Sequence, residues 1–377
     1  MKYLYVTTIS MTLDYFLKGV MADLVKTGNE VVAVSSPGPW MAGVRAIEGV
    51  KVIEVPMERR ISPFKDLRSL CRLYNVIRAE RPDIVHSFTP KAGLLAMMAS
   101  KLAGIKIRVH TFTGLVFPTS TGLKKRLLMT TDRVTCSCAT HIIAEGQGVR
   151  KDLVDAGITK KEVRVLGHGN IRGIDLAYYD RTPEVMELAD KLRVPDVFTF
   201  LFVGRVVRDK GIIELVQAFE RICSDNQAVR LVLVGPFEND VDPVPEDIRQ
   251  RIGENPAIIT TGELTGIDLL AWYAASDCFV LPSYREGFPN TVIEAGAMGL
   301  PSIVTDINGS REIITDGING LIVPPRDADA LYNAMCKILD DNCFRESVAS
   351  VCREMIASRF EEGQVRVNLL NFYSEIK

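Results

Sequence analysis

The sequence predicts an α/β protein with two parallel sheets, each covered by helices. Short apolar segments alternate with amphipathic ones, the alternation stops between residues 166 and 196, and it then starts again. Strands that alternate with helices over short links form parallel sheets. The length of 377 residues suits two domains better than one.

In the first half, short apolar runs are interpreted as strands and longer amphipathic runs as helices. The first strand lies at Tyr3–Thr7 and is followed by a helix at Asp14–Lys26. The longest helix, Phe64–Glu80, has an apolar face. The other predicted elements are strands at Val31–Ser35, Val52–Val55, Ile84–Ser87, Ile107–Thr111 and His141–Ala144, and helices at Ala92–Ala103 and Lys124–Ala139.

The stretch from residue 166 to residue 196 breaks this pattern, and we interpret it as a linker. A second alternating run follows it, with helices between the strands. Its predicted strands are Thr199–Val203, Arg230–Val234, Ile258–Thr260, Cys278–Leu281, Ser302–Val304 and Gly320–Val323.

The composition is that of a soluble globular protein, with 47% hydrophobic and 24% charged residues. The sequence has no apolar run long enough to span a bilayer, and its first residues lack the pattern of a signal peptide. The eight cysteines form no C-x-x-C pair, which indicates reduced thiols. We therefore expect a cytoplasmic protein.

The net charge of −2 hides an asymmetry between the two halves. Residues 1–185 contain 27 basic and 17 acidic residues, a balance of +10, which leaves −12 for the remainder. A basic first half can attract an anionic partner. Ordinary surface charge explains the same numbers, and the two interpretations stay open. We expect no nucleic-acid partner.

The stretch Pro282–Ala297 is the most informative of the chain. It follows an apolar strand and contains a Gly/Pro turn and then a helix that Asn290 can cap. Glu286 precedes this helix and Glu294 lies in its first turns, so both can face a ligand at the helix N-terminus. That end favours a phosphate, and the carboxylates favour hydroxyls. The spacing thus indicates a phosphorylated sugar, and a strand–turn–helix joint with two solvated acids is an equal alternative.

Common nucleotide and metal motifs are missing. The sequence has no P-loop, and no G-x-G-x-x-G pattern follows the first strand. The two D-x-D patterns lie at Asp240–Asp242, in a polar loop, and at Asp327–Asp329, which we interpret as a helix start. We expect no metal ion and no cofactor.

At Glu286 and Glu294 the sequence resembles the E-x7-E motif of retaining GT-B glycosyltransferases, glycosyltransferase family 4 in particular. The segment Gly204–Gly211 is similar to the G-R-x4-K-G motif of that family. Other similar segments in the second half are Leu233–Pro236, Thr261–Glu263, Gly309–Glu312 and Asp316–Leu321. In the first half, the sequence resembles a bacterial polysaccharide and lipid-linked oligosaccharide branch at Val85–Gly93, Val109–Leu115 and Gly169–Asp175.

This resemblance covers most of the chain and implies the GT-B fold, in which two Rossmann-like domains with parallel sheets face a central cleft. Residues 1–185 would form the acceptor-side domain and residues 186–359 the donor-binding domain. The segment from about 360 to 377, with a helix at Gln364–Ile376, would cross back to the first domain.

The resemblance also implies a nucleoside diphosphate sugar as donor, with UDP as the expected nucleotide. Arg205 and Lys210 would neutralise the diphosphate. Glu286 would contact the donor sugar and Glu294 the ribose hydroxyls. The other donor-binding residues that it implies are Gly204, Gly262, Leu264, Gly287, Phe288, Pro289, Asn290 and Thr291.

His110 is the first-domain residue that the resemblance places near the donor sugar. It follows Ile107–Val109 and so can face the cleft, whereas a buried histidine with a structural role is the alternative. In some family members the histidine stands where this chain has Thr113. For His86, at another strand end, the structural interpretation is favoured.

The acceptor side departs from the family pattern in the first strand–helix loop. Many members have a glycine-rich turn there, but Thr7–Thr12 contains no glycine. Ser10 and Thr12 are expected to supply hydroxyl and N–H groups to the acceptor. Lys91 is also expected to lie on the acceptor side.

The implied reaction transfers a hexose to an acceptor hydroxyl with retention at the anomeric carbon. The departing phosphate would take the acceptor proton, and the protein would stabilise charge on the diphosphate. The rival hypotheses are a GT-B nucleotide-sugar epimerase and a non-catalytic nucleotide-sugar-binding protein.

We hypothesise a polyprenyl-diphosphate-linked acceptor and a peripheral position on the inner face of the cell membrane. The basic first half motivates this, as does Gly122–Met129, whose apolar and basic residues suit a membrane surface. A core-packed helix with solvated lysines explains that segment equally well.

Overall fold

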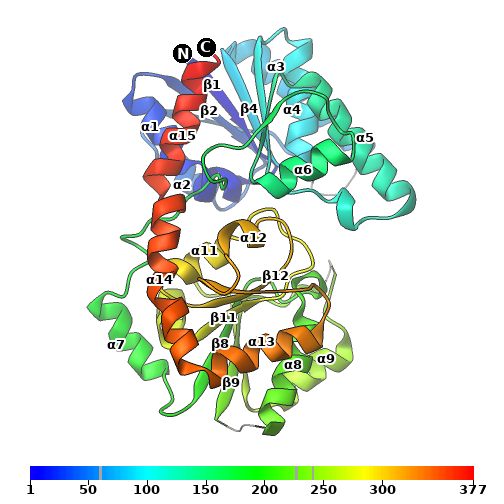
Figure 1. Ribbon diagram of the computed structural model, residues 1–377. Coiled ribbons are helices and arrows are strands. Elements are labelled where there is room, and N and C mark those ends of the chain that lie inside the picture. Colours follow the sequence, from blue (N-terminus) through cyan, green and yellow to red (C-terminus); the bar gives the residue numbers. More distant parts are fainter. Residues whose placement is uncertain (59–61, 226–227, 240–241) are drawn as a thin grey trace. The chain divides into compact units, whose positions relative to one another are not determined.

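The computed structural model describes residues 1–58, 62–225, 228–239 and 242–377. The chain divides into two compact units, residues 1–173 with 362–377 and residues 174–361. Each unit contains a parallel sheet with helices packed on it (Figure 1). The predicted pair of parallel sheets is therefore confirmed.

The unit boundary differs from the expected one at residue 185, because residues 174–185 belong to the second unit. Ile174 and Tyr179 are buried in its core, and the Ile174 N–H donates to the Phe360 carbonyl at 2.8 Å. The return to the first unit begins at Glu362, close to the expected residue 360.

Within the described residues, the first unit has a seven-stranded sheet in the order β3-β2-β1-β4-β5-β6-β7. Its strands are β1 (Lys2–Val6), β2 (Glu30–Ser35), β3 (Val50–Glu54), β4 (Ile84–Phe88), β5 (Ile107–Phe112), β6 (His141–Ala144) and β7 (Val163–Arg164). Its helices are α1 (Lys18–Lys26), α2 (Met41–Arg45), α3 (Pro63–Glu80), α4 (Pro90–Leu102), α5 (Gly122–Cys138), α6 (Gln147–Asp155) and α15 (Glu362–Glu375), with short helical turns at Thr12–Phe16 and Phe117–Thr119.

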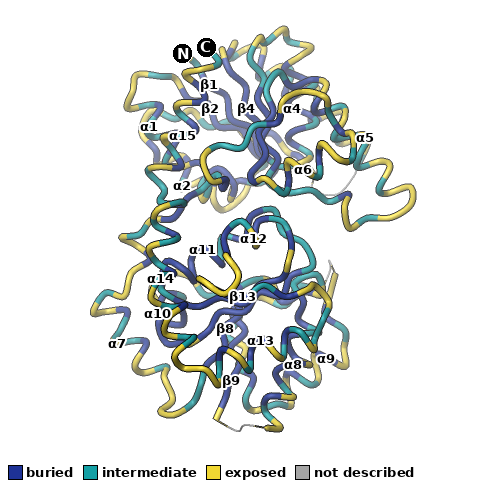
Figure 2. The backbone as a smooth tube through the Cα atoms, viewed as in Figure 1, coloured by how far each residue is buried: buried dark blue, intermediate teal, exposed yellow. Residues whose placement is uncertain are grey.

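Two apolar cores fill the two faces of this sheet. Helices α3, α4, α5 and α6 contribute to one core, and α1, α2 and α15 contribute to the other. Figure 2 shows the strands as buried, with exposed residues along the outer sides of the helices. Helix α15 therefore completes a core whose other buried residues lie between Tyr3 and Ile143.

A buried polar network fixes α15 to the sheet. The Tyr373 hydroxyl contacts the Tyr5 hydroxyl at 2.8 Å and also bonds to His86 Nδ1. His86 Nε2 bonds to Thr111 Oγ1 at 2.7 Å. The favoured structural interpretation of His86 agrees with this position, and a contact with the acceptor would need an accessible side chain that His86 lacks.

His110 was expected to be able to face the cleft, with a buried structural histidine as the alternative, and its position in the structure agrees with the alternative. Strand β5 continues to Phe112, so His110 lies inside it and is buried. Its Nδ1 bonds to Ser87 Oγ at 2.8 Å, and a Cβ atom added to Gly93 would lie 2.2 Å from its ring. His110 therefore packs beneath α4.

The second unit has, within the described residues, a six-stranded sheet in the order β10-β9-β8-β11-β12-β13. Its strands are β8 (Phe198–Val203), β9 (Val229–Val234), β10 (Ile258–Gly262), β11 (Cys278–Leu281), β12 (Ser302–Thr305) and β13 (Gly320–Val323). Its helices are α7 (Pro183–Leu192), α8 (Ile212–Asp225), α9 (Glu246–Glu254), α10 (Gly266–Ala275), α11 (Asn290–Ala297), α12 (Ser310–Ile313), α13 (Ala328–Asp340) and α14 (Asn342–Phe360), with a helical turn at Arg208–Lys210.

The segment interpreted as a linker contains helix α7, so that prediction is wrong in part. Thr182 caps the helix by accepting a hydrogen bond from the Val185 N–H, and Pro183 occupies its first position. These residues are ordinary helix-start signals.

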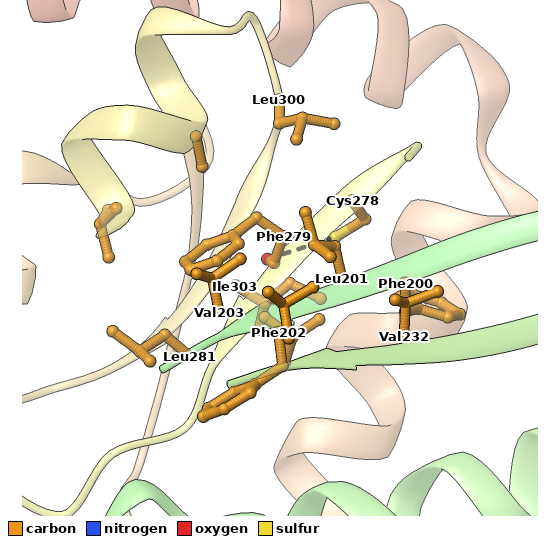
Figure 3. Close-up of a cluster of buried hydrophobic side chains, with 14 of the residues drawn as sticks. Phe200, Leu201, Phe202, Val203, Val232, Cys278, Phe279, Leu281, Leu300 and Ile303 are labelled. Atoms are coloured by element: carbon orange, nitrogen blue, oxygen red, sulfur yellow. Dashed lines mark hydrogen bonds between the residues drawn. The ribbon is translucent and has the colours of Figure 1, made fainter. Parts of the chain in front are cut away.

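The core of the second unit is built on aromatic and branched residues of its central strands. Figure 3 shows Phe200 and Phe202 of β8 with Phe279 of β11 and Ile303 of β12. Strands buried on both faces read as continuous apolar runs, which is why these strands were predictable.

In the part of the chain that the structure describes, no helix is long and apolar enough to cross a membrane. The Gly122–Met129 segment forms the start of α5 and packs only in part as the core-helix interpretation expects, and the membrane contact stays a prediction. Leu128 and Met129 pack against the core, whereas Leu123 and Leu127 are exposed.

We expect the first unit to lose unfolding free energy as the pH falls below about 6.5. Burial lowers the pKa of His86 well below its usual value and that of His110 to about 3, so both rings stay neutral when folded. The unfolded chain binds these protons below pH 6.5, so each ring lowers the stability by up to about 1.4 kcal/mol per pH unit. His110→Asn should therefore make the loss shallower.

The measurement is hydrogen exchange of first-unit amides between pH 7.5 and pH 5.5, corrected for intrinsic exchange rates. The same pH dependence in the wild type and in His110→Asn would contradict the prediction.

Candidate functional site

The predicted donor residues gather where the strand order of the second sheet reverses. The chain builds outwards from β8 to β10 on one side and then returns to β11, which pairs with the other edge of β8. The loops after β8 and β11 therefore leave neighbouring strand ends in opposite directions. In open α/β sheets this position holds the ligand. Arg205 and Lys210 follow β8, and Glu286 follows β11.

An ion pair joins these two loops. Lys210 Nζ bonds to Glu286 Oε1, and Ser283 Oγ donates to the same carboxylate oxygen at 2.7 Å. The Lys210 and Glu286 side chains are only 18% and 14% exposed, so little water screens the pair. The structure thus brings together the two predicted residues expected to contact the phosphate and the sugar.

Backbone and side-chain contacts hold the loops in this arrangement. The Tyr284 N–H donates to the Asp209 carbonyl at 2.8 Å, and Arg285 Nη2 donates to Asp209 Oδ2 at 2.8 Å. Gly211 has a φ of +73°, and a Cβ atom there would lie 2.0 Å from the Pro282 carbonyl oxygen. Only glycine fits this approach.

Arg205 lies in the same loop as Lys210 but has another partner. Its Nη1 pairs with Glu238 Oε2 at 2.7 Å, and its side chain is exposed. Both predicted phosphate-binding cations are thus paired with carboxylates. An incoming diphosphate can take over either cation without leaving it unpaired.

Glu294 lies inside α11 and is 3% exposed. The Tyr273 hydroxyl donates to its Oε2 at 3.1 Å, which orients the carboxylate. The prediction that Asn290 caps this helix is wrong, because Pro289 occupies the capping position and Asn290 is the first helical residue. Thr291 is the second helical residue and is half-buried.

The turn before α11 is tightly packed. Phe288 is buried against Phe360, with ring centroids 5.5 Å apart. A Cβ atom on Gly309 would lie 2.5 Å from the Gly287 carbonyl oxygen. Gly287 and Pro289 are therefore held by the segment that follows β12.

Glycines at three adjacent strand ends keep the neighbouring edge open. The Gly235 N–H donates to the Gly262 carbonyl at 2.8 Å, and a Cβ atom on Gly235 would lie 1.9 Å from the Gly204 carbonyl oxygen. Leu264 follows and is partly buried against the core. A flat ligand can approach the backbone of Gly204 and Gly262 because neither carries a side chain.

The predicted acceptor-side residues of the first unit are more dispersed. Ser10 and Thr12 are buried, and Ser10 Oγ packs on Gly38. Lys91 Nζ pairs with Asp66 Oδ1 at 2.6 Å. Thr113 follows β5 and is half-buried.

Several partners of these residues were not predicted. Ser283 lies within the motif and could have been identified from its spacing to Glu286. Glu238, Tyr273 and Asp66 lie on other elements, and no sequence pattern links them to their partners.

Of the two D-x-D patterns, the structure describes only the second in full. Asp327 accepts a hydrogen bond from the Ala330 N–H at 2.9 Å and caps α13, which confirms that interpretation. Asp240 lies outside the described residues. Among the residues that the structure does describe, no group of three or more His, Cys, Asp or Glu could hold a metal ion.

A pair of glycine substitutions tests the contact between the two loops. Gly211 and Gly262 have nearly equal φ values of +73° and +72°, but a Cβ atom on Gly262 would meet nothing within 4 Å. Both alanine variants should lose about 1–2 kcal/mol from the left-handed backbone. Only Gly211→Ala has the additional clash, so its unfolding midpoint in urea should be clearly lower, whereas equal midpoints would contradict the loop contact.

Comparisons with known proteins agree with this geometry. A family model described as "Glycosyl transferases group 1" matches residues 197–341, and one described as "Glycosyl transferase 4-like domain" matches residues 15–169. The capsular polysaccharide biosynthesis glycosyltransferase CapM of Staphylococcus aureus is 29% identical, over 99% of this chain and 97% of its own. An Escherichia coli α-1,3-galactosyltransferase, which acts on GlcNAc-diphosphoundecaprenol, is 27% identical over 83% and 81%.

Solved structures show the same fold. HepE of Anabaena, crystallised with UDP, superposes with a TM-score of 0.80 at 19% identity and covers 100% of both chains. Sucrose-phosphate synthase of Thermosynechococcus elongatus superposes with a TM-score of 0.81 at 19% identity, over 100% and 99%.

The two family models leave only the ends of the chain and the segment between residues 169 and 197 unmatched. Both describe glycosyl transferases, which decides against the epimerase and the non-catalytic binding protein. The chain belongs to glycosyltransferase family 4 and is a glycosyltransferase with the GT-B fold.

Proposed function

We propose that this enzyme transfers a hexosyl group from a UDP-sugar to a hydroxyl of a lipid-linked saccharide during the synthesis of a bacterial surface polysaccharide. The ion pair of Lys210 and Glu286 at the reversal of the second sheet carries the donor part of this proposal. The UDP bound to HepE and the lipid-linked acceptor of the Escherichia coli relative support it.

In the proposed donor complex, Lys210 and Arg205 exchange their carboxylate partners for the diphosphate. Lys210 supplies a compact charge and Arg205 a planar fork of donors. The N-terminus of α11 adds partial positive charge at the same edge. Glu286, freed from Lys210, then accepts hydrogen bonds from sugar hydroxyls, and Glu294 accepts from the ribose.

The proposed reaction breaks the bond between the anomeric carbon and the β-phosphate oxygen. A bond from the acceptor oxygen to the same face of that carbon forms, and the acceptor proton passes to the departing phosphate. The products are UDP and the elongated saccharide. Lys210 and Arg205 stabilise the negative charge that grows on the diphosphate, so this step requires no metal ion.

Removing either cation should weaken donor binding. For Arg205→Ala and Lys210→Ala we expect UDP affinity to fall by about 10- to 100-fold, because each loses a charge-assisted hydrogen bond. Arg208→Ala is the matched control, since Arg208 is an exposed cation of the same loop. Calorimetric titration with UDP measures the effect, and equal affinities in all three variants would place the donor elsewhere.

Glu286→Gln should separate nucleotide binding from transfer. Without the carboxylate, Lys210 is free for the diphosphate, so UDP should bind several-fold more tightly, by about 1 kcal/mol. Transfer should fall at least about 100-fold, because the charged acceptor of the sugar hydroxyls is lost.

Glu238→Gln is the comparison for this variant, since it frees Arg205 in the same way. It should tighten UDP binding and retain transfer. Weaker UDP binding in Glu286→Gln would mean that the ion pair organises the site instead of competing with the donor.

A further inference from the structure

The first unit has a cavity at the reversal of its own sheet. In this sheet β1 lies between β2 and β4. The chain adds β2 and β3 on one side of β1 and then adds β4 to β7 on the other side. The cavity is lined by residues that follow β1, β4 and β5, together with residues of α3, α4 and α5. Its volume is about 460 Å³, within the usual range of about 300–1,000 Å³ for ligand sites.

Most of its wall is apolar. Leu94 and Leu95 come from α4, Val116 from the loop after β5, and Leu127 and Leu128 from α5. A wholly polar ligand would leave these side chains without apolar contact. The wall therefore favours an apolar chain.

One part of the lining is charged. Lys91 Nζ pairs with Asp66 Oδ1 at 2.6 Å, and both residues line the cavity. The hydroxyls of Thr8 and Thr89, which also line it, bond to each other at 2.8 Å. An anionic group beside Lys91 could replace Asp66 as its partner, as the diphosphate is proposed to replace Glu286 at Lys210.

The helices that line the cavity also carry exposed apolar and basic residues. On α5, Leu123 is 82% exposed and is followed by Lys124 and Arg126, both exposed. On α3, Phe64 is 91% exposed and lies two residues before Asp66. Exposed apolar side chains among cations are typical of surfaces that contact anionic membranes.

We propose that this cavity binds the lipid part of the acceptor, an apolar chain joined to a diphosphate. The leucines of α4 and α5 contact the chain, and Lys91 pairs with the diphosphate after releasing Asp66. The site combines an apolar wall, a cation and a membrane-compatible rim, which match the three parts of a lipid diphosphate in a bilayer. This inference rests on the proposed function, because it identifies where that acceptor is held.

The first test fills the cavity. Farnesyl diphosphate serves as a soluble probe, and its affinity for the full chain is measured by calorimetry. Leu94→Trp should weaken it at least about tenfold, since the larger ring occupies the apolar space. Leu102→Trp, on the same helix but exposed and outside the cavity, should leave it unchanged. Equal effects of both variants would overturn the proposal.

The second test concerns the charge. Asp66→Asn should tighten farnesyl diphosphate binding several-fold and Lys91→Gln should weaken it about tenfold, because one removes the competing carboxylate and the other removes the cation. Inorganic diphosphate should bind far more weakly than farnesyl diphosphate and be insensitive to Leu94→Trp. Equal affinity for the two probes would mean an anion site only, and competition by vesicles of phosphatidylglycerol alone would mean a phospholipid site; either result overturns the proposal.

UDP titration of the same variants separates this inference from the proposed function. Leu94→Trp, Asp66→Asn and Lys91→Gln should bind UDP like the wild type. These three residues belong to the first unit, whereas the proposed donor residues belong to the second. If UDP binds normally but farnesyl diphosphate does not bind to the wild type, the lipid site is wrong and the donor site stands. If UDP fails to bind to the wild type, the proposed function is wrong.

Discussion

The reversal of strand order in each sheet is the constraint on which the rest of the structure depends. A parallel sheet that grows first to one side and then to the other leaves a gap between two loops at its carboxyl edge. In the second unit this gap lies between the loops after β8 and β11 and is lined by charged and small residues. In the first unit the corresponding position, after β1 and β4, is lined mainly by apolar residues. The same topology thus produces two positions whose linings differ in chemistry.

Carboxylates accompany the cations at both positions. Lys210 is paired with Glu286, Arg205 with Glu238 and Lys91 with Asp66. Lys210 and Lys91 are largely buried, and a buried cation without a partner costs free energy, so their pairs stabilise the unliganded protein, whereas the exposed pair of Arg205 contributes little. A phosphate that replaces the carboxylate gains only the difference in free energy between the cation–phosphate pair and the cation–carboxylate pair. Such an exchange favours moderate affinity, which suits an enzyme that must release its nucleotide product after each turnover.

Much of the fold was predictable because the strands are buried on both faces and stand out as apolar runs. That Lys210 and Glu286 lie at the same edge of the sheet was predictable because each follows one of those strands directly. The burial of His110 was not decided by the sequence, because its ring packs against Gly93 of α4, a tertiary contact that the pattern of the strand itself does not encode. Asn290 was misplaced by a single residue, which is the ordinary uncertainty of a helix end. The partnerships of Glu238, Tyr273 and Asp66 depend on tertiary contacts that local patterns do not encode.

Helix α15 has a consequence for the order in which the protein is made. Its residues complete the core of the first unit, yet they follow the whole of the second unit in the chain. A ribosome that adds about 5–20 residues per second needs roughly 10 to 40 s to synthesise residues 174–361. During that time the Tyr5 and His86 side chains lack Tyr373, and the apolar face that α15 later covers is exposed. The half of the enzyme that is translated first is therefore the half that is finished last, and it is this half that a chaperone would have most time to meet.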